Sequence, residues 1–412
     1  MFGLYQYLLN ESRYLSIVGI LAILAVALLF SNNRTKINIR LVLTALGMQF
    51  LLAFCILKTG LGQNIFGSLS HAFEAIYSFA DKGSSFVFGS LADTSGIWGM
   101  IFVVKVLPTI IFFGALMALL FHLGIVQFFV TGLAMFIRPL LGTSGAETLA
   151  VAANVMLGQT EAPLLIKNYL PSMTQSEMLV VMVGGMSHLS GSLLAVYGSM
   201  GVPIQHLLVS SFMAIPGAIL IAKMLVPETE TPVTLGGGTT SLKSESKNIL
   251  DAVSKGTTDG LSLAVNVAAM LISFISLMAL IDYLLFAGTN ALGYGITLNQ
   301  VFGRIFYGVA YLLSIPAADC EIAGALLGQK LVINEFVAYL SFAKANLLPR
   351  TQAILTYALA GFSNFSCIGI QIGGIGAICP EKRTLLTQFG MRALLGGTLT
   401  NLLSAAIVGL LL

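Results

Sequence analysis

The chain has 412 residues, of which 57% are hydrophobic and 9% are charged, whereas an ordinary soluble domain carries about 25% charged residues. This composition excludes a soluble globular protein, because too few charges are present to keep such a surface dissolved. The net charge is +3. The sequence shows no phosphate-binding loop, zinc motif or nucleic-acid motif, so it gives no sign of an enzyme, a resident cofactor or a nucleic-acid partner.

Long hydrophobic stretches recur along the chain and predict membrane-spanning helices. The first has no charge between Arg13 and Arg34 and is long enough to cross a hydrocarbon core of about 30 Å. The others are 41–57, 106–137, 178–222, 260–281, 351–380 and 393–412. We expect Gly124 to divide the stretch 106–137, and the Gly- and Pro-containing segment 198–203 to divide 178–222 into two helices. The sequence therefore predicts an all-α polytopic membrane protein with about eight transmembrane helices.

Polar segments between these stretches predict elements outside the bilayer core. Residues 68–93 are expected to form an interfacial helix, 226–248 a flexible linker rich in Gly, Thr and Ser, and 249–260 an amphipathic surface helix. The basic loop 32–40 is expected in the cytoplasm, which places the N-terminus outside.

The two halves of the chain resemble each other in the order of their polar segments. In each half a glutamate in an interrupted hydrophobic segment, Glu161 and then Glu335, is followed at similar spacings by a proline, a Thr-Gln pair and a glycine-containing helix. Paired, interrupted segments are typical of secondary transporters built from inverted repeats. We therefore expect two re-entrant helical hairpins, an internal inverted repeat and broken helices at a binding site. A chance similarity between membrane segments is the alternative.

The repeat predicts a division of the chain into five parts. They are peripheral and scaffold helices with the interfacial helix (1–121), the first repeat of a transport domain (122–226), the polar linker and amphipathic helix (227–259), a scaffold helix (260–290) and the second repeat of the transport domain (291–412).

The segment 158–163 predicts the tip of the first hairpin, because a glycine and a proline bracket Gln159, Thr160 and Glu161. A carboxylate at membrane depth costs at least about 2.5–3.5 kcal/mol, so it should face protein, water or a ligand. Unpaired backbone groups at such a tip are tolerated where they line a cavity or are buried in protein. An ion pair between Glu161 and Lys167 is the alternative.

Glu335 stands at the matching place in the second half, with Lys330 or Lys344 as alternative ion-pair partners. Farther along, Asn364 and Cys367 lie in the middle of an uncharged stretch and are flanked by glycines. This cluster predicts a helix that is unwound or closely approached at a binding site, whereas a buried amide alone often bonds only to a neighbouring helix.

Other classes of protein fit less well. An intramembrane serine hydrolase would use Ser144 of "GTSG" with His188 as the base, but a pattern of four small residues is weak evidence in a glycine-rich chain. An ion channel would need a continuous polar pore, and the polar residues cluster in two patches instead. Glu147 is expected to cap a helix N-terminus.

Three stretches, "LGQTEAPLLIK", "KLVINEFVAYL" and "GFSNFSCIGI", resemble the characteristic sequences of the concentrative nucleoside transporter family. The similarity runs in register from about residue 35 to the C-terminus. It implies a homotrimer in the plasma membrane, the inner membrane of a bacterium, in which a transport domain moves against a trimeric scaffold. The residues that it implies for the nucleobase are Gln159, Thr160, Glu161, Leu193 and Phe362, and those for the ribose are Glu335, Asn364 and Cys367.

The same resemblance implies a sodium site formed by Asn154, the Leu157 carbonyl, Ser187 and His188. Two positions depart from the family. Cys367 stands where a serine is common, and a thiol is a weak hydrogen-bonding group. His188 stands where a small hydroxyl residue is common, and histidine titrates near neutrality. The expected function is sodium-driven import of uridine-like nucleosides, with proton coupling or a free nucleobase as the alternatives.

Overall fold

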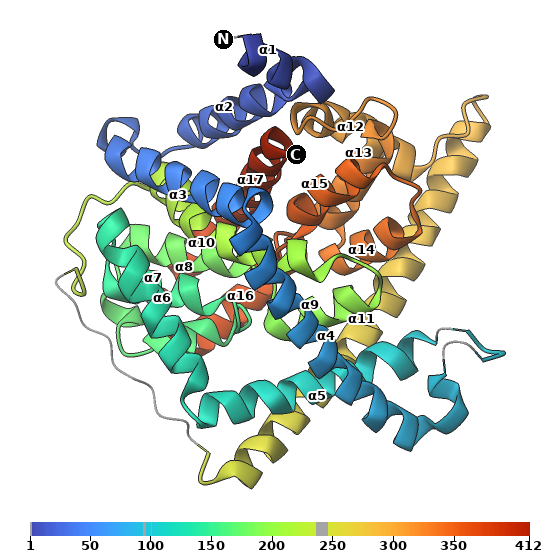
Figure 1. Cartoon of the computed structure of the whole chain (residues 1–412), viewed down its shortest axis with the longest axis horizontal. Helices are drawn as coiled ribbons and strands as arrows, with labels where there is room; N and C mark the ends of the chain where they lie inside the picture. The colour runs from blue at the N-terminus through green and yellow to red at the C-terminus, as the bar shows by residue number, and fades with distance from the viewer. Residues whose placement is uncertain (1, 94–95, 100, 236–245) are drawn as a thin grey trace.

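The computed structural model describes residues 2–93, 96–99, 101–235 and 246–412, and every regular element within them is helical. The predicted all-α class is confirmed (Figure 1). The α-helices are α1 (Phe2–Leu9), α2 (Tyr14–Leu29), α3 (Ile39–Lys58), α4 (Gly60–Phe88), α5 (Phe102–His122), α6 (Ile125–Leu141), α7 (Gly145–Ala153), α8 (Gln175–Ser187), α9 (Gly191–Ser199), α10 (Ile204–Leu225), α11 (Ile249–Asn290), α12 (Leu298–Leu312), α13 (Cys320–Val332), α14 (Glu335–Lys344), α15 (Pro349–Leu359), α16 (Phe365–Ile378) and α17 (Arg383–Leu411). The short 3-10 helices are η1 (Asn10–Ser12), η2 (Arg34–Lys36), η3 (Gly89–Ala92), η4 (Ala162–Ile166), η5 (Leu170–Ser172) and η6 (Pro380–Lys382). Residues 236–245 of the predicted linker lie outside the described residues.

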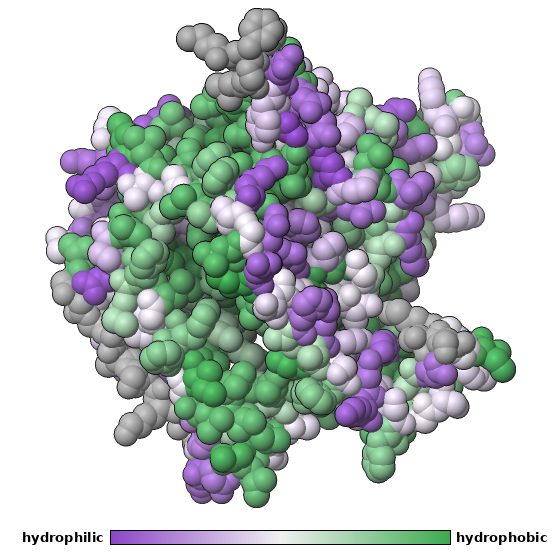
Figure 2. Space-filling model, viewed as in Figure 1, coloured by the Kyte–Doolittle hydropathy of each residue, from purple (hydrophilic) through white to green (hydrophobic). Residues whose placement is uncertain are grey.

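Among the described residues, six helices are long and apolar enough to cross a membrane, or seven if the bent pair containing α2 counts as one span. This count of membrane-crossing helices is lower than the predicted number of about eight. One reason is that the stretch 351–380, predicted as a single span, is divided into α15 and α16, and each of these helices is short. The apolar windows of α5 and α11 are only 28% and 11% buried, so these helices expose hydrophobic side chains. Figure 2 shows hydrophobic residues spread over much of one face. The chain is an integral membrane protein.

The predicted helix breaks are found, and one more break is present. Gly124 adopts a φ of +78° between α5 and α6, and α9 and α10 are separated at residues 200–203. The stretch 178–222 nevertheless forms three helices and not two, because the chain also breaks between Ser187 and Gly191. At this break the Gly191 N–H makes a tertiary contact, since it donates to the Met156 carbonyl of the first hairpin at 3.1 Å.

α11 joins the predicted surface helix and the predicted scaffold span in one continuous helix, which Asn248 caps by accepting from the Asp251 N–H at 2.9 Å. It packs closely along α5 (Figure 1). A Cβ atom on Gly114 of α5 would lie 2.8 Å from the Gly256 carbonyl oxygen of α11, so glycine is required for this approach. The division into transport and scaffold domains remains a prediction.

The order of elements repeats along the chain. α6 and α12 each precede a hairpin, formed first by α7 with η4 and η5 and then by α13 with α14. A broken helix follows each hairpin, α8–α9 in the first half and α15–α16 in the second. A long buried helix, α10 or α17, ends each half. The similarity seen in the sequence is therefore a repeat of structure.

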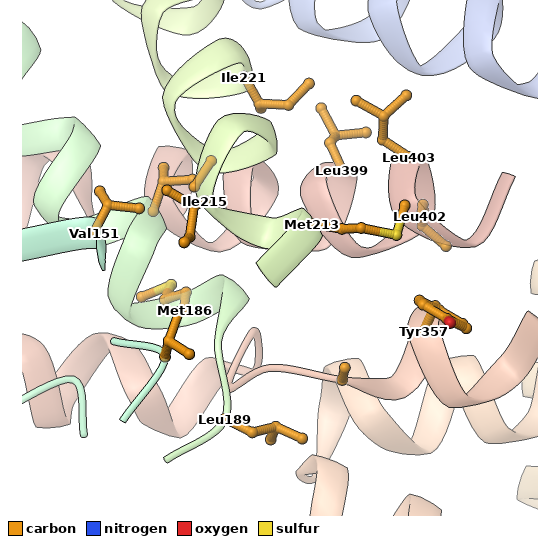
Figure 3. Packing of buried hydrophobic residues seen from close by; sticks show 14 of the residues in the cluster. Val151, Met186, Leu189, Met213, Ile215, Ile221, Tyr357, Leu399, Leu402 and Leu403 are labelled. Carbon is orange, nitrogen blue, oxygen red and sulfur yellow. The ribbon is translucent and has the colours of Figure 1, made fainter. Parts of the chain in front are cut away.

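The core lies where α8, α10 and α17 meet. Figure 3 shows side chains from these helices gathered together, including Met186, Ile215 and Leu399. α8–α9 and α10 each have apolar windows that are 94% buried, although both helices are hydrophobic enough to face lipid. The outer helices thus enclose a hydrophobic centre, against which the two hairpins are placed.

Candidate functional site

A cavity of about 700 Å³ lies between the hairpins and the paired helices α5 and α11. The residues predicted to contact a nucleoside all line it: Gln159, Thr160, Glu161, Leu193, Glu335, Phe362, Asn364 and Cys367. They come from the tip of the first hairpin, from α9 and α14, from the break between α15 and α16, and from the first turn of α16. The structure therefore brings together two clusters that are about 170 residues apart in the sequence.

The tip of the first hairpin is held between two glycine-lined helices. A Cβ atom on Gly185 of α8 would lie 3.0 Å from Cβ of Gln159, and one on Gly374 of α16 would lie 2.7 Å from Cγ2 of Thr160. The Glu161 carboxylate accepts from the Gly158 N–H at 3.1 Å, and its side chain is exposed at the cavity. The glycines noticed in the sequence of α16 thus allow this helix to approach the tip.

Glu335 lies at the first position of α14, and the preceding Asn334 caps the helix by accepting from the Val337 N–H at 2.9 Å. The Glu335 carboxylate is buried, with 5% of the residue exposed. It accepts from Asn364 Nδ2 at 2.9 Å and from the Tyr197 hydroxyl at 3.2 Å. A helix N-terminus stabilises a nearby carboxylate, so both neighbours and backbone fix Glu335 in place.

Ion pairs of Glu335 with Lys330 or Lys344, the alternative to a binding role, are not among the ion pairs of the described residues. Lys330 Nζ donates instead to the carbonyls of Ala358 and Ala360 and to Asn401 Oδ1. Lys344 lies nine residues farther along α14, a separation of about 13 Å at 1.5 Å per residue. Glu335 is therefore a buried carboxylate whose contacts come from a hydroxyl, an amide and a helix terminus.

The second helix break spans residues 360–364 and positions Asn364 as the cap of α16. Its Oδ1 accepts from the Cys367 N–H at 3.1 Å while its Nδ2 donates to Glu335, so both ends of the amide are used. Cys367 is buried and accepts from Gln159 Nε2 at 3.3 Å. The thiol thus connects the two halves of the site, a contact that sequence reasoning did not anticipate.

Tyr197 contacts the Glu335 carboxylate, and sequence reasoning missed this supporting residue. It is fully buried on α9, donates to Glu335 and packs against Tyr339 with ring centroids 4.5 Å apart. The sequence did contain a signal, because Tyr197 lies four residues after Leu193 and positions i and i+4 share one face of a helix. The side of the cavity formed by α5 and α11 was also missed; it includes Phe113, Asp259 and Asn266.

The residues predicted to bind sodium lie between the end of α7 and the tip of the first hairpin, and at the first helix break. Asn154 follows α7, is 2% exposed, and donates from Nδ2 to the Ala150 carbonyl, while its Oδ1 has no hydrogen-bond partner in the described part of the chain. Leu157 lines the cavity. The His188 ring is buried, with Nδ1 2.8 Å from the Gly184 carbonyl and 3.2 Å from the Ser187 hydroxyl.

Glu147 forms the predicted helix cap. It completes a capping box with Ser144 at the start of α7 and forms an ion pair with Lys223 at 2.8 Å. The hydroxyl of Ser144 donates to Glu177 near the start of α8, whereas His188 follows the end of that helix. The eleven residues from Glu177 to His188 correspond to about 16 Å, so the arrangement does not provide the serine–histidine pair of a hydrolase.

Hairpins and broken helices around one polar cavity define a secondary transporter. Models of the sodium-dependent nucleoside transporters match this chain over residues 18–91 for the N-terminal part and 206–409 for the C-terminal part, and a nucleoside-recognition "Gate" model matches 103–203. The chain belongs to the concentrative nucleoside transporter family.

Related proteins from several organisms align with nearly all of the chain. An uncharacterized transporter of Haemophilus influenzae is 43% identical over 96% of this chain and 97% of its own length. The nucleoside permease NupC of Helicobacter pylori is 37% identical over 97% and 98%. The sodium/nucleoside cotransporter 2 of Rattus norvegicus is 33% identical over 98% of this chain and 63% of its own length.

Solved structures of CNTnw share the fold. One in an inward-facing, substrate-bound state has a TM-score of 0.92 at 37% identity, covering 96% of this chain and 97% of its own. A variant of CNTnw in an outward-facing state has a TM-score of 0.93, also at 37% identity, with 97% of both chains covered.

Proposed function

We propose that the protein is a symporter that imports nucleosides such as uridine and is driven by an inward sodium gradient. A transport domain formed by the two repeats would carry the cavity across the membrane, moving against a trimeric scaffold. The observation that carries the proposal is the chemistry of the cavity. An amide and a hydroxyl at the first hairpin face a carboxylate and an amide of the second half, as a ligand with a base and a sugar requires.

The first hairpin offers groups that match a nucleobase edge. Gln159 has a buried Oε1 with no hydrogen-bond partner among the described residues. An amide oxygen without a partner accepts from a base N–H, and the Thr160 hydroxyl can donate or accept. Leu193 and Phe362 supply apolar surface on the same cavity. These four residues and Glu161 are proposed to contact the base.

The second half offers a fixed acceptor for sugar hydroxyls. A carboxylate has about four lone-pair sites, and in Glu335 the described contacts are those from Tyr197 and Asn364 and the helix terminus. Neighbouring ribose hydroxyls would donate to the remaining sites, with Asn364 and Cys367 beside them. A free nucleobase would leave Glu335 without this role, which favours a nucleoside as the substrate.

Sodium is proposed to bind between the first hairpin and the first helix break. The Asn154 Oδ1, buried without a described partner, is an oxygen ligand of the kind that a hard cation takes. With the Leu157 carbonyl and the segment containing Ser187 and His188, it would order the hairpin tip. The ordered tip would then bind nucleoside more tightly, and by linkage the nucleoside would strengthen cation binding equally.

Proton coupling is a second candidate, because a titratable imidazole, that of His188, lies at this break beside the Gly184 carbonyl. In that case protonation of a side chain would take the place of sodium.

Uptake of radiolabelled uridine into proteoliposomes tests both candidates, with an inward sodium gradient at equal pH in one arm and a proton gradient without sodium in the other. We expect concentration of uridine only in the sodium arm, and loss of that effect in Asn154→Leu. Uptake in the proton arm alone would overturn sodium coupling. Accumulation of free uracil without uridine would overturn the proposed substrate.

A further inference from the structure

Lys330 is a buried cation in the second hairpin that the proposed function does not use. It lies in the last turn of α13, with 3% of the residue exposed. Its Nζ donates to the carbonyls of Ala358 and Ala360, both at 2.9 Å, and to Asn401 Oδ1 at 2.8 Å. An ammonium group has three donors, so all of its hydrogen-bonding capacity is used within this cluster.

The two carbonyls belong to the end of α15, where the helix breaks beside Asn364. Carbonyls in the last turn of a helix lack partners within the helix and carry the negative end of its dipole. The ion pairs found among the described residues do not include Lys330. The ammonium therefore acts on the broken helix end itself, as a bound cation would.

The position of Lys330 beside the end of α15 corresponds to the position in the first repeat where the exchangeable cation is proposed to bind. There, Asn154 at the end of α7 presents an oxygen with no partner among the described residues, and a Cβ atom on Gly184, in the last turn of α8 before the break, would lie 3.5 Å from its Nδ2. α13 corresponds to α7, and α15 to α8, in the order of the repeat. In the second repeat, the end of the hairpin helix supplies an ammonium in place of an oxygen ligand.

Asn401 of α17 connects the two breaks. Its Oδ1 accepts from Lys330, and its Nδ2 donates to the Ser187 carbonyl at 2.8 Å. The orientation of the amide is fixed, because a lysine can only donate and a carbonyl can only accept. Gly361, with a φ of +93°, brings the second break so close that a Cβ atom would lie 2.7 Å from the Ser187 oxygen.

We infer that Lys330 is a positioning residue whose ammonium is a fixed cation at the second helix break, in the place where the first repeat takes an exchangeable one. The ammonium holds residues 360–364 in the shape that presents Phe362 and Asn364 to the cavity. The second repeat therefore needs no ion from solution to form its half of the site. The expected effect on nucleoside affinity rests on the proposed function.

Lys330→Ala in the full-length protein tests this inference. Uridine affinity is measured by calorimetry on purified protein at a fixed pH and saturating sodium, with and without methylammonium. We expect the variant to bind uridine about tenfold to a hundredfold more weakly, because hydrogen bonds to a buried charge are lost. Methylammonium, which restores a cation in the space left by the side chain, is expected to recover most of the affinity.

Lys223→Ala is the matched control, since Lys223 is also buried but pairs with Glu147 and Glu228 away from the breaks. It is expected to lower thermal stability without changing uridine affinity in either buffer. An unchanged affinity in Lys330→Ala would overturn the inference. A loss that methylammonium does not reverse would also overturn it, because Lys330 would then act through packing alone.

A second pair of variants covers the case in which Lys330→Ala does not fold. Lys330→Arg retains the charge and Lys330→Met removes it, so the arginine variant is expected to bind uridine more tightly than the methionine variant. Equal affinities of these two variants would count against a fixed cation.

If the wild-type protein binds no uridine, the proposed function fails. A rise in the melting temperature of Lys330→Ala on adding methylammonium would still support the role of Lys330, and no rise would refute it.

Discussion

Glu161 and Glu335 occupy corresponding places in the two repeats, yet their surroundings differ. Glu335 is buried at the start of a regular helix and accepts from Tyr197 and Asn364. Glu161 precedes a short 3-10 turn, η4, is exposed at the cavity and accepts from the Gly158 N–H of its own tip. The Glu335 carboxylate is thus held by its own helix α14, by α9 and by the break before α16. The described contact of the Glu161 carboxylate is with a residue only three positions away in the chain.

This difference indicates unequal roles for the two hairpins. A group that neighbouring elements hold in position needs no reorganisation when the ligand arrives. In the proposed mechanism, Glu335 would therefore act as a preformed acceptor, while the tip around Glu161 would adjust its shape when cation or nucleoside binds. The second half would set how tightly the sugar is held, and the first half would respond to the coupling ion.

The largest effect is expected for Glu335→Gln. Replacing the charge would weaken the two proposed hydrogen bonds to ribose hydroxyls, each worth about 1.5–3 kcal/mol when the acceptor is charged. Uridine kcat/KM should therefore fall by at least about a hundredfold. The measurement is uptake into proteoliposomes, with chromatography to show that the oligomer is retained. Wild-type uptake by this variant would remove Glu335 from the site.

Glu161→Gln should have a smaller effect, because the described contact of this carboxylate is local. We expect a threefold to tenfold rise in the uridine KM, about the value of one ordinary hydrogen bond. The same uptake assay measures it. A loss as large as that of Glu335→Gln would contradict the proposed inequality of the two hairpins.

Two adjacent glycines on α16, Gly373 and Gly374, allow a test of how the first hairpin tip depends on its packing against this helix. In Gly374→Ala the new Cβ would lie 2.7 Å from the Thr160 side chain, whereas one on Gly373 would meet nothing within 4 Å. Overpacking typically costs about 1–3 kcal/mol, so Gly374→Ala should raise the uridine KM severalfold.

Gly373→Ala is the control, because both substitutions improve helix propensity equally and only one touches the tip. It should leave the KM unchanged and raise the melting temperature slightly. Equal KM values in the two variants would show that Thr160 does not depend on the approach of α16.

The smallest effect is expected for Cys367→Ser. A hydroxyl of similar shape can still accept from Gln159 and is a stronger partner for a ribose hydroxyl than a thiol. We expect the uridine KM to fall by about threefold or less, and the inhibition constant of a competing nucleobase to stay unchanged. A rise in the uridine KM would indicate that the thiol is already adapted to the ligand.

Much of the molecule followed from the sequence. Low charge and long hydrophobic stretches required a membrane protein, because these segments cannot remain in water. Glycine and proline marked the breaks near residues 124 and 198–203, and the position of polar residues such as Gln159 and Asn364 among apolar ones marked the site. These features are local, so neighbouring residues alone determine them.

Tertiary structure decided what local pattern could not. The break between Ser187 and Gly191 contains no proline, and at this break the Gly191 N–H donates to the Met156 carbonyl of the hairpin. An ion pair with Glu335 was one alternative for Lys330, and its contacts are instead a helix end and Asn401, 71 residues away. Partners separated by long stretches of chain depend on how helices pack, and sequence spacing does not contain that information.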